Sequence, residues 1–239
     1  MKMERLHQTL LQIHDTWAGQ TLTLTEWLKW WEKERQKVWC LDEVGKFANF
    51  SAALLQRAMP GSAFWRRKLL FEEKLKTRAD ITRGKIENLL RKEGYRFLRD
   101  GVEVVLDAAE IAFAADFRWE TYFAQARKEA PYFLDDPFLK IRNVGLKTRN
   151  FALSLFLEEF IAPDRHIKRI LQRLGLIRRP MASGFEAVVA AQTLAHRLGM
   201  SPTQLDRLLW HLGRTVCRKN HTACQICPLN PLCLTAADR

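Results

Sequence analysis

The sequence lacks the features that mark membrane and secreted proteins. Its 239 residues contain no run of about 18 apolar residues, so no membrane-spanning helix is predicted. The first eight residues, M-K-M-E-R-L-H-Q, do not form the apolar core of a secretory signal. We therefore expect a cytoplasmic protein that does not contact a membrane.

The sequence also lacks internal repeats, low-complexity segments and the alternating pattern of β-strands. Apolar residues recur instead with helical spacing, and the hydrophobic content of 47% is sufficient for a core. Thr23 and Glu26 are spaced as a capping box before a helix whose tryptophans, Trp27, Trp30 and Trp31, are expected in the core rather than stacked on bases. Further helices are predicted over residues 4–15, 42–58, 64–75, 81–92, 101–115 and 119–128, so the fold class is all-α.

Acidic residues are outnumbered, with 27 Asp and Glu against 39 Lys and Arg, which gives a net charge of +12 and a pI near 9.8. This excess favours a polyanionic partner, and nucleic acid is the usual one. A soluble protein with a basic surface is the alternative, because charge alone does not separate the two.

Cysteine is scarce, and four of the five cysteines fall in one short stretch with the spacing C-x6-C-x2-C-x5-C: Cys217, Cys224, Cys227 and Cys233. Sets of four thiolates hold zinc or an iron–sulfur cluster. Zinc sites usually present two close pairs, which this spacing does not provide. Disulfides are disfavoured in the cytoplasm. Cys40 stands apart and is expected to be a small buried apolar residue.

This cysteine spacing resembles the iron–sulfur loop of the endonuclease III branch of the helix-hairpin-helix DNA glycosylases. The resemblance implies a [4Fe-4S] cluster held by the four cysteines in a loop over residues 217–233. It also implies that Arg218 and Lys219, inside the first spacing, contact DNA phosphates.

Residues 138–157, F-L-K-I-R-N-V-G-L-K-T-R-N-F-A-L-S-L-F-L, resemble the family's hairpin, whose usual form is L-P-G-V-G-x-K-T-A. Gly145 is expected to allow a tight turn with positive φ, and a second helix is expected from about Leu146. N–H groups at that helix start suit a DNA phosphate, which makes Arg142, Asn143, Val144 and Gly145 candidate DNA-binding residues. Arg142 and Asn143 replace the usual Pro-Gly, and Asn tolerates the left-handed region.

Two residues match the family's catalytic positions. Lys147 falls at the catalytic lysine, where the helix start and partial burial would lower its pKa and favour the nucleophilic amine. A plain phosphate-binding or solvated lysine is the alternative. Asp164 precedes an apolar helix face as an N-cap, and the stretch from it to Ile170 matches V-D-x-H-V-x-R-V, which carries the family's catalytic aspartate.

The residue that fills the gap left by an extruded base is less clearly marked. Gln56 or Arg57 lies in the expected neighbourhood, but the family's Gln-x-Thr pattern is absent. Both are equally consistent with ordinary helix-surface positions, so the lesion stays open.

The resemblance implies two helical lobes with a DNA groove between them. One is a barrel over residues 46–157 that ends in the hairpin, and the other joins residues 1–45 to 158–239. The expected protein is a monomeric base-excision-repair enzyme, nucleoid-associated in a prokaryote. It would remove a damaged, oxidised base from double-stranded DNA and cleave the abasic site as a lyase. The alternatives are action on 8-oxoguanine or another modified base, and a non-catalytic, metal-containing DNA-binding module. An adenine glycosylase is disfavoured, because Lys147 is present and little chain follows the cysteines.

Overall fold

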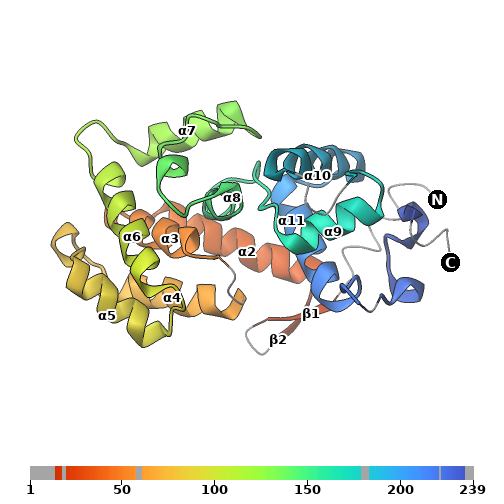
Figure 1. Cartoon of the computed structure of the whole chain (residues 1–239), viewed down its shortest axis with the longest axis horizontal. Coiled ribbons are helices and arrows are strands. Elements are labelled where there is room, and N and C mark those ends of the chain that lie inside the picture. Colours follow the sequence, from red (N-terminus) through yellow and green to blue (C-terminus); the bar gives the residue numbers. More distant parts are fainter. Residues whose placement is uncertain (1–13, 18–19, 58–60, 179–182, 221, 235–239) are drawn as a thin grey trace. The chain divides into compact units, whose positions relative to one another are not determined.

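The computed structural model describes residues 14–17, 20–57, 61–178, 183–220 and 222–234 (Figure 1). The described residues form ten α-helices, α2 to α11, and one hairpin of two four-residue strands, β1 (His14–Trp17) and β2 (Gln20–Thr23). The predicted all-α class is confirmed apart from this hairpin. The helix predicted over residues 4–15 lies mostly outside the described residues, and it is wrong at its last two positions, which belong to β1.

The chain divides into two compact units, and each is described by itself. One comprises residues 34–157, and the other comprises the chain up to Lys33 together with the chain from Glu158. The N-terminal division therefore falls within α2 (Leu24–Trp39), whereas the sequence analysis placed it after residue 45. No helix among the described residues is long and apolar enough to cross a membrane.

The unit over residues 34–157 is built around α3 (Glu43–Leu54), which is buried along most of its length. It packs against α4 (Gly61–Lys74), α6 (Leu98–Ala112) and α8 (Leu146–Leu153), which explains why its sequence is apolar on most faces. The remaining elements are two α-helices, α5 (Arg83–Glu93) and α7 (Trp119–Glu129), and two short 3-10 helices, η1 (Arg78–Asp80) and η2 (Pro137–Lys140). Aromatic rings fill its core. The ring centroids of Phe50 and Phe138 lie 4.7 Å apart, and those of Phe123 and Phe156 lie 4.4 Å apart.

In the other unit, α11 (Pro202–Thr215) packs against both α9 (Arg165–Arg173) and α10 (Gly184–Leu198). The backbones of α9 and α11 approach closely at Gly213, where an added Cβ would lie 2.5 Å from the Cβ of His166. Two short turns, η3 (Cys224–Ile226) and η4 (Asn230–Leu232), follow in the cysteine loop.

Local sequence signals placed several helix starts correctly. Thr23 and Glu26 form the predicted capping box, since the N–H of Thr23 donates to Glu26 at 2.8 Å and that of Glu26 donates to Thr23 Oγ1 at 3.2 Å.

The core assignment of Trp27 and Trp31 is confirmed, because both are buried and their ring centroids lie 5.5 Å apart in a stacked arrangement. The expectation for Cys40 is wrong, because it follows the end of α2 in a turn and is exposed.

Candidate functional site

The turn of the predicted helix-hairpin-helix element joins η2 to α8. As predicted, α8 begins at Leu146. We call this element the hairpin. The N–H of Val144 donates to the Ile141 carbonyl at 3.1 Å, which closes a four-residue turn. Its third residue, Asn143, has a φ of 70°, whereas Gly145 is extended with a φ of −112°. The prediction of positive φ at Gly145 is therefore wrong. Asn143 takes the left-handed position, because the third residue of such a turn is where positive φ is required.

Gly145 has a different role at the start of α8. It is the exposed N-cap, its N–H donates to Thr148 Oγ1 at 3.3 Å, and a Cβ added to it would meet nothing within 4 Å. The backbone at the helix start is therefore open to a close-fitting ligand. Arg142 and Asn143 are also exposed, whereas the side chain of Val144 is buried and anchors the turn.

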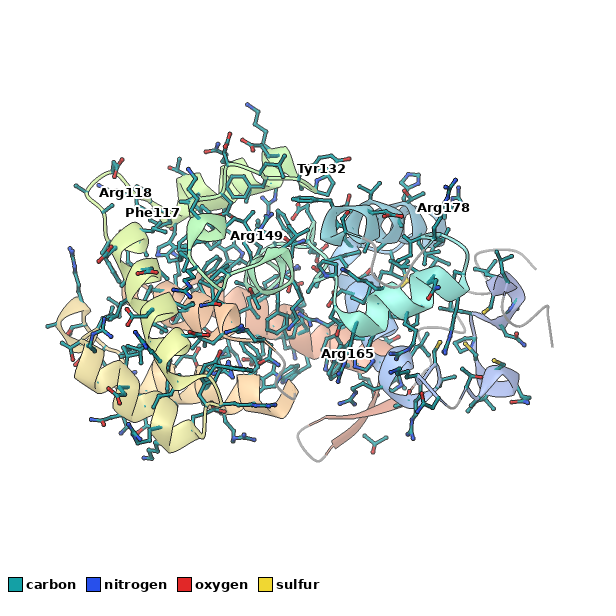
Figure 2. All side chains as sticks on the ribbon, in the orientation of Figure 1. Phe117, Arg118, Tyr132, Arg149, Arg165 and Arg178 are labelled. Carbon is teal, nitrogen blue, oxygen red and sulfur yellow. The ribbon has the colours of Figure 1, made fainter. Side chains whose placement is uncertain are left out.

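A buried ion pair ties the two halves of the hairpin together. Asp136 caps η2, since Phe138 N–H donates to its Oδ1 at 2.8 Å, and its Oδ2 accepts from the Tyr122 hydroxyl at 2.9 Å. Arg149 of α8, which is labelled in Figure 2, lies with its Nε 3.6 Å from the same Oδ2. Both side chains are fully buried. Burial raises the pKa of Asp136 to about 6, against the opposing effects of Arg149 and the two hydrogen bonds.

Sequence reasoning missed this pair. An Asp directly before Pro137 is a signal for a helix start and for capping. Nothing in the sequence connects it to an arginine in the next helix.

The side chain of Lys147 is half-buried and reaches the end of α3. Its Nζ donates to the carbonyl of Gln56 and, at 3.3 Å, to that of Arg57. The structure therefore brings the predicted nucleophile against the backbone of the segment predicted to fill the gap in the duplex. We call residues 55–57 the post-α3 segment.

Neither candidate in the post-α3 segment is a helix-surface residue, because α3 ends at Leu54. The side chain of Gln56 is only 6% exposed. That of Arg57 is half-exposed, with Nη1 2.8 Å from Asp100 Oδ2 and its guanidinium 4.7 Å from the ring centroid of Phe97. In this conformation Arg57 presents the more accessible side chain of the two.

Asp164 lies in the other unit and caps α9 as predicted. Its Oδ1 accepts the N–H groups of His166 at 2.8 Å and Ile167 at 2.9 Å, and the side chain is half-buried. These two bonds fix the carboxylate at the start of α9. Burial lowers the pKa of the adjacent His166, although Asp164 opposes this.

Two arginines of α9 hold the start of the cysteine loop. Arg169 donates to the carbonyls of Gly213 at 2.6 Å and Cys217 at 2.9 Å. Arg173 donates to Cys217 Sγ at 2.9 Å and to the carbonyls of Arg218 and Lys219 at 2.9 and 3.2 Å. The helix that Asp164 caps therefore contacts the cysteine loop at its other end. Arg173 is a second residue that sequence reasoning missed.

The four clustered cysteines line one small cavity together with Arg173. All four are half-buried and free, which excludes the disulfide alternative in this structure. The pKa of Cys227 is raised by burial and by the other three cysteines near it. Among the described residues, no group of three or more His, Cys, Asp or Glu side chains is placed to hold a single metal ion.

Four thiols around one cavity, with a guanidinium donor to one sulfur, have the chemistry to hold a thiolate-bound metal group. Arg218 and Lys219 are exposed at the edge of the loop.

Comparison with known proteins gives a sequence match over part of the chain and fold matches over 88–91% of it. No family model matches the chain. Endonuclease III of Rickettsia prowazekii (strain Madrid E) is 31% identical over 97 residues, which cover 40% of this chain and 43% of that protein. The match thus spans less than half of that curated relative.

Three solved structures share the fold. Endonuclease III, trapped as a covalent intermediate with DNA, has a TM-score of 0.54 at 18% identity and covers 91% of this chain and 99% of its own. The 8-oxoguanine DNA glycosylase of Thermotoga maritima gives 0.64 at 18%, covering 88% and 96%. That of Methanocaldococcus jannaschii gives 0.67 at 16%, covering 89% and 93%. At 16–18% identity, these structures show that the chain shares the fold of endonuclease III and of these 8-oxoguanine DNA glycosylases.

Proposed function

We propose that this protein is a DNA glycosylase with an associated lyase activity, which removes a damaged, oxidised base from double-stranded DNA. The observation that carries the proposal is the placement of Lys147. Lys147 is the second residue of α8, the second helix of the hairpin. Its side chain is half-buried, and its amine donates to two backbone carbonyls. An amine fixed in this way beside an open helix start is suited to attack a sugar whose phosphate binds the hairpin.

Each proposed step pairs a bond that forms with a bond that breaks. The free amine of Lys147 attacks C1′ as the bond from C1′ to the base breaks, and the base leaves with that electron pair. Asp164 stabilises the positive charge that develops at C1′ and accepts a proton from the attacking amine. The lysine nitrogen then forms the C1′=N bond of a Schiff base as the C1′–O4′ bond breaks, and O4′ takes up a proton. A base, water or a carboxylate, removes a proton from C2′, the C3′–O bond breaks, and the 3′ phosphate leaves, which nicks the strand.

The DNA backbone is expected to bind at two basic surfaces. Arg142, Asn143 and Gly145 offer a cation and open backbone at the start of α8, and Arg218 and Lys219 offer two cations on the cysteine loop. The net charge of +12 supports this partner. We expect the protein to act as a monomer.

The four cysteines would hold a [4Fe-4S] cluster. When bound, the cluster crosslinks the loop, and its role in the proposal is structural. The chain itself supplies Arg173, which donates to Cys217 Sγ and to two loop carbonyls, so it would orient both a ligand and the basic residues around it. Stoichiometric iron and sulfide with broad visible absorption in the purified protein test this assignment. One zinc per chain would contradict it.

Borohydride trapping on duplex DNA that carries an abasic site tests the lysine chemistry. Wild type is expected to form a covalent adduct and Lys147→Ala none. Lys128→Ala, which removes an exposed lysine of α7 in the same unit, serves as the matched control and is expected to react like wild type. The lysine assignment fails if wild type gives no adduct or if Lys147→Ala gives as much as wild type.

The lesion has one specific alternative. Two of the solved structures with this fold are 8-oxoguanine DNA glycosylases, which makes 8-oxoguanine the second candidate. A panel of duplexes with one defined lesion each, including oxidised pyrimidines and 8-oxoguanine, separates the two. A non-catalytic DNA-binding module predicts instead that no duplex is cleaved and that Asp164→Asn changes nothing measurable on DNA.

A further inference from the structure

The post-α3 segment is held by residues about 40 positions further along the chain. Its first carbonyl, that of Leu55, accepts the hydroxyl of Tyr95 at 3.0 Å. Its last side chain, Arg57, pairs with Asp100 and covers the ring of Phe97. Tyr95 and Phe97 lie in the junction between α5 and α6, and Asp100 lies in the first turn of α6. The segment whose carbonyls receive the Lys147 amine is therefore held at both of its ends by this part of the unit.

Tyr95 is itself tightly placed. Gly94 ends α5 with a φ of 75°, and the N–H of Tyr95 returns to the Leu90 carbonyl at 2.8 Å. The Tyr95 ring lies over Gly101, where an added Cβ would come within 2.5 Å of Cε1. The buried guanidinium of Arg67 lies 5.0 Å from the ring centroid. Because the Tyr95 ring is confined by these contacts, the position of its buried hydroxyl oxygen is fixed.

We propose that Tyr95 is a positioning residue for the reaction of Lys147, an inference that rests on the proposed function. Its hydroxyl fixes the Leu55 carbonyl and with it the two following carbonyls, to which the lysine amine donates. These carbonyls set where the amine lies before it attacks. Because attack depends steeply on the position of the nucleophile, loosening them lowers the rate of adduct formation without weakening DNA binding.

Tyr95→Phe tests this, because it removes one hydroxyl and keeps the ring. We expect trapping on an abasic duplex, at saturating protein, to slow by about two- to tenfold, the range equivalent to one hydrogen bond. The Kd for a duplex with a non-cleavable abasic analogue is expected to stay at the wild-type value. This split separates positioning from a general loss of folded protein.

Thr203→Val is the structural control. It also removes a buried hydroxyl that donates to a backbone carbonyl, that of Phe160 at 3.1 Å, in the other unit. Both variants are expected to lower the Tm, but only Tyr95→Phe is expected to slow trapping. Wild-type trapping by Tyr95→Phe, or an equal slowing by Thr203→Val, overturns the proposal.

A second measurement does not depend on enzymatic activity. Reductive methylation with formaldehyde and cyanoborohydride, followed by mass spectrometry, reports how fast each lysine amine reacts. In Tyr95→Phe, Lys147 is expected to react faster than in wild type by about two- to tenfold, while exposed Lys128 is unchanged. If wild type forms no adduct with DNA, the proposed function fails. Unchanged labelling of Lys147 in Tyr95→Phe, by contrast, overturns the role of Tyr95 alone.

Discussion

Arg149→Met leaves the Asp136 carboxyl buried beneath the hairpin without its opposite charge. Both side chains are fully buried, and Arg149 Nε lies 3.6 Å from Asp136 Oδ2. Breaking such a pair from one side costs about 3–5 kcal/mol, because the desolvated partner remains. Met occupies much of the volume of Arg, so the loss is electrostatic rather than a cavity. We expect the free energy of unfolding to fall by that amount near neutral pH.

The pH dependence makes this prediction specific. The pKa of Asp136 is about 6 in the folded protein against an ordinary value of 3.8, a difference that corresponds to about 3 kcal/mol. The folded protein thus binds this proton more tightly than the unfolded chain does. The resulting stabilisation is complete below about pH 3.8 and is lost as pH rises through about 6. Arg149 holds this pKa down, so removing it extends the loss to higher pH.

Urea unfolding followed by tryptophan fluorescence measures both effects, at about pH 5 and about pH 8. The difference between wild type and Arg149→Met is expected to be smaller at about pH 5, where the stranded carboxyl is protonated. Adding Asp136→Asn to Arg149→Met removes the titrating group and is expected to recover stability at about pH 8. The reasoning is refuted if Arg149→Met costs less than about 1 kcal/mol, or if its cost is the same at both pH values.

Three further predictions follow from single contacts. Asp164→Asn keeps the cap of α9, so it is expected to change the unfolding free energy by less than about 0.5 kcal/mol and to slow the trapping reaction greatly. Asp164→Ala also removes the cap and is expected to cost about 1 kcal/mol in addition. Equal trapping by Asp164→Asn and wild type would show that Asp164 takes no part in the reaction. Gly213→Ala is expected to cost about 1–3 kcal/mol in urea unfolding, because the new Cβ would lie 2.5 Å from the Cβ of His166, and a neutral result would show that α9 and α11 separate freely. Gly145→Ala meets no neighbour within 4 Å at a φ of −112°, so its Tm is expected to equal that of wild type while its Kd for duplex DNA rises; unchanged DNA affinity would mean that the start of α8 is not a phosphate site.

The sequence by itself determined the features that depend on neighbours along the chain. Helical periodicity gave the all-α class, and the cap at Asp164 and the helix start at Leu146 followed from residues within one turn. The missed β-hairpin and the wrong φ at Gly145 show the limit of such signals. Two four-residue strands are too short for a periodic pattern, and a turn with two residues able to take positive φ does not reveal which one does.

Only the tertiary structure decided which distant residues meet. Lys147 reaches the carbonyls of residues 56 and 57, and Tyr95 fixes that same segment from the α5–α6 junction. Asp136 pairs with Arg149 beneath the hairpin, and Arg173 joins α9 to Cys217. Every residue has a backbone carbonyl, so the sequence does not mark which one a side chain will contact. In the sequence, a charged residue that is buried cannot be told from one at the surface until its partner is known. The spacing of residues therefore indicated a nucleophile and a ligand set, whereas the packing of helices determined what holds each of them in place.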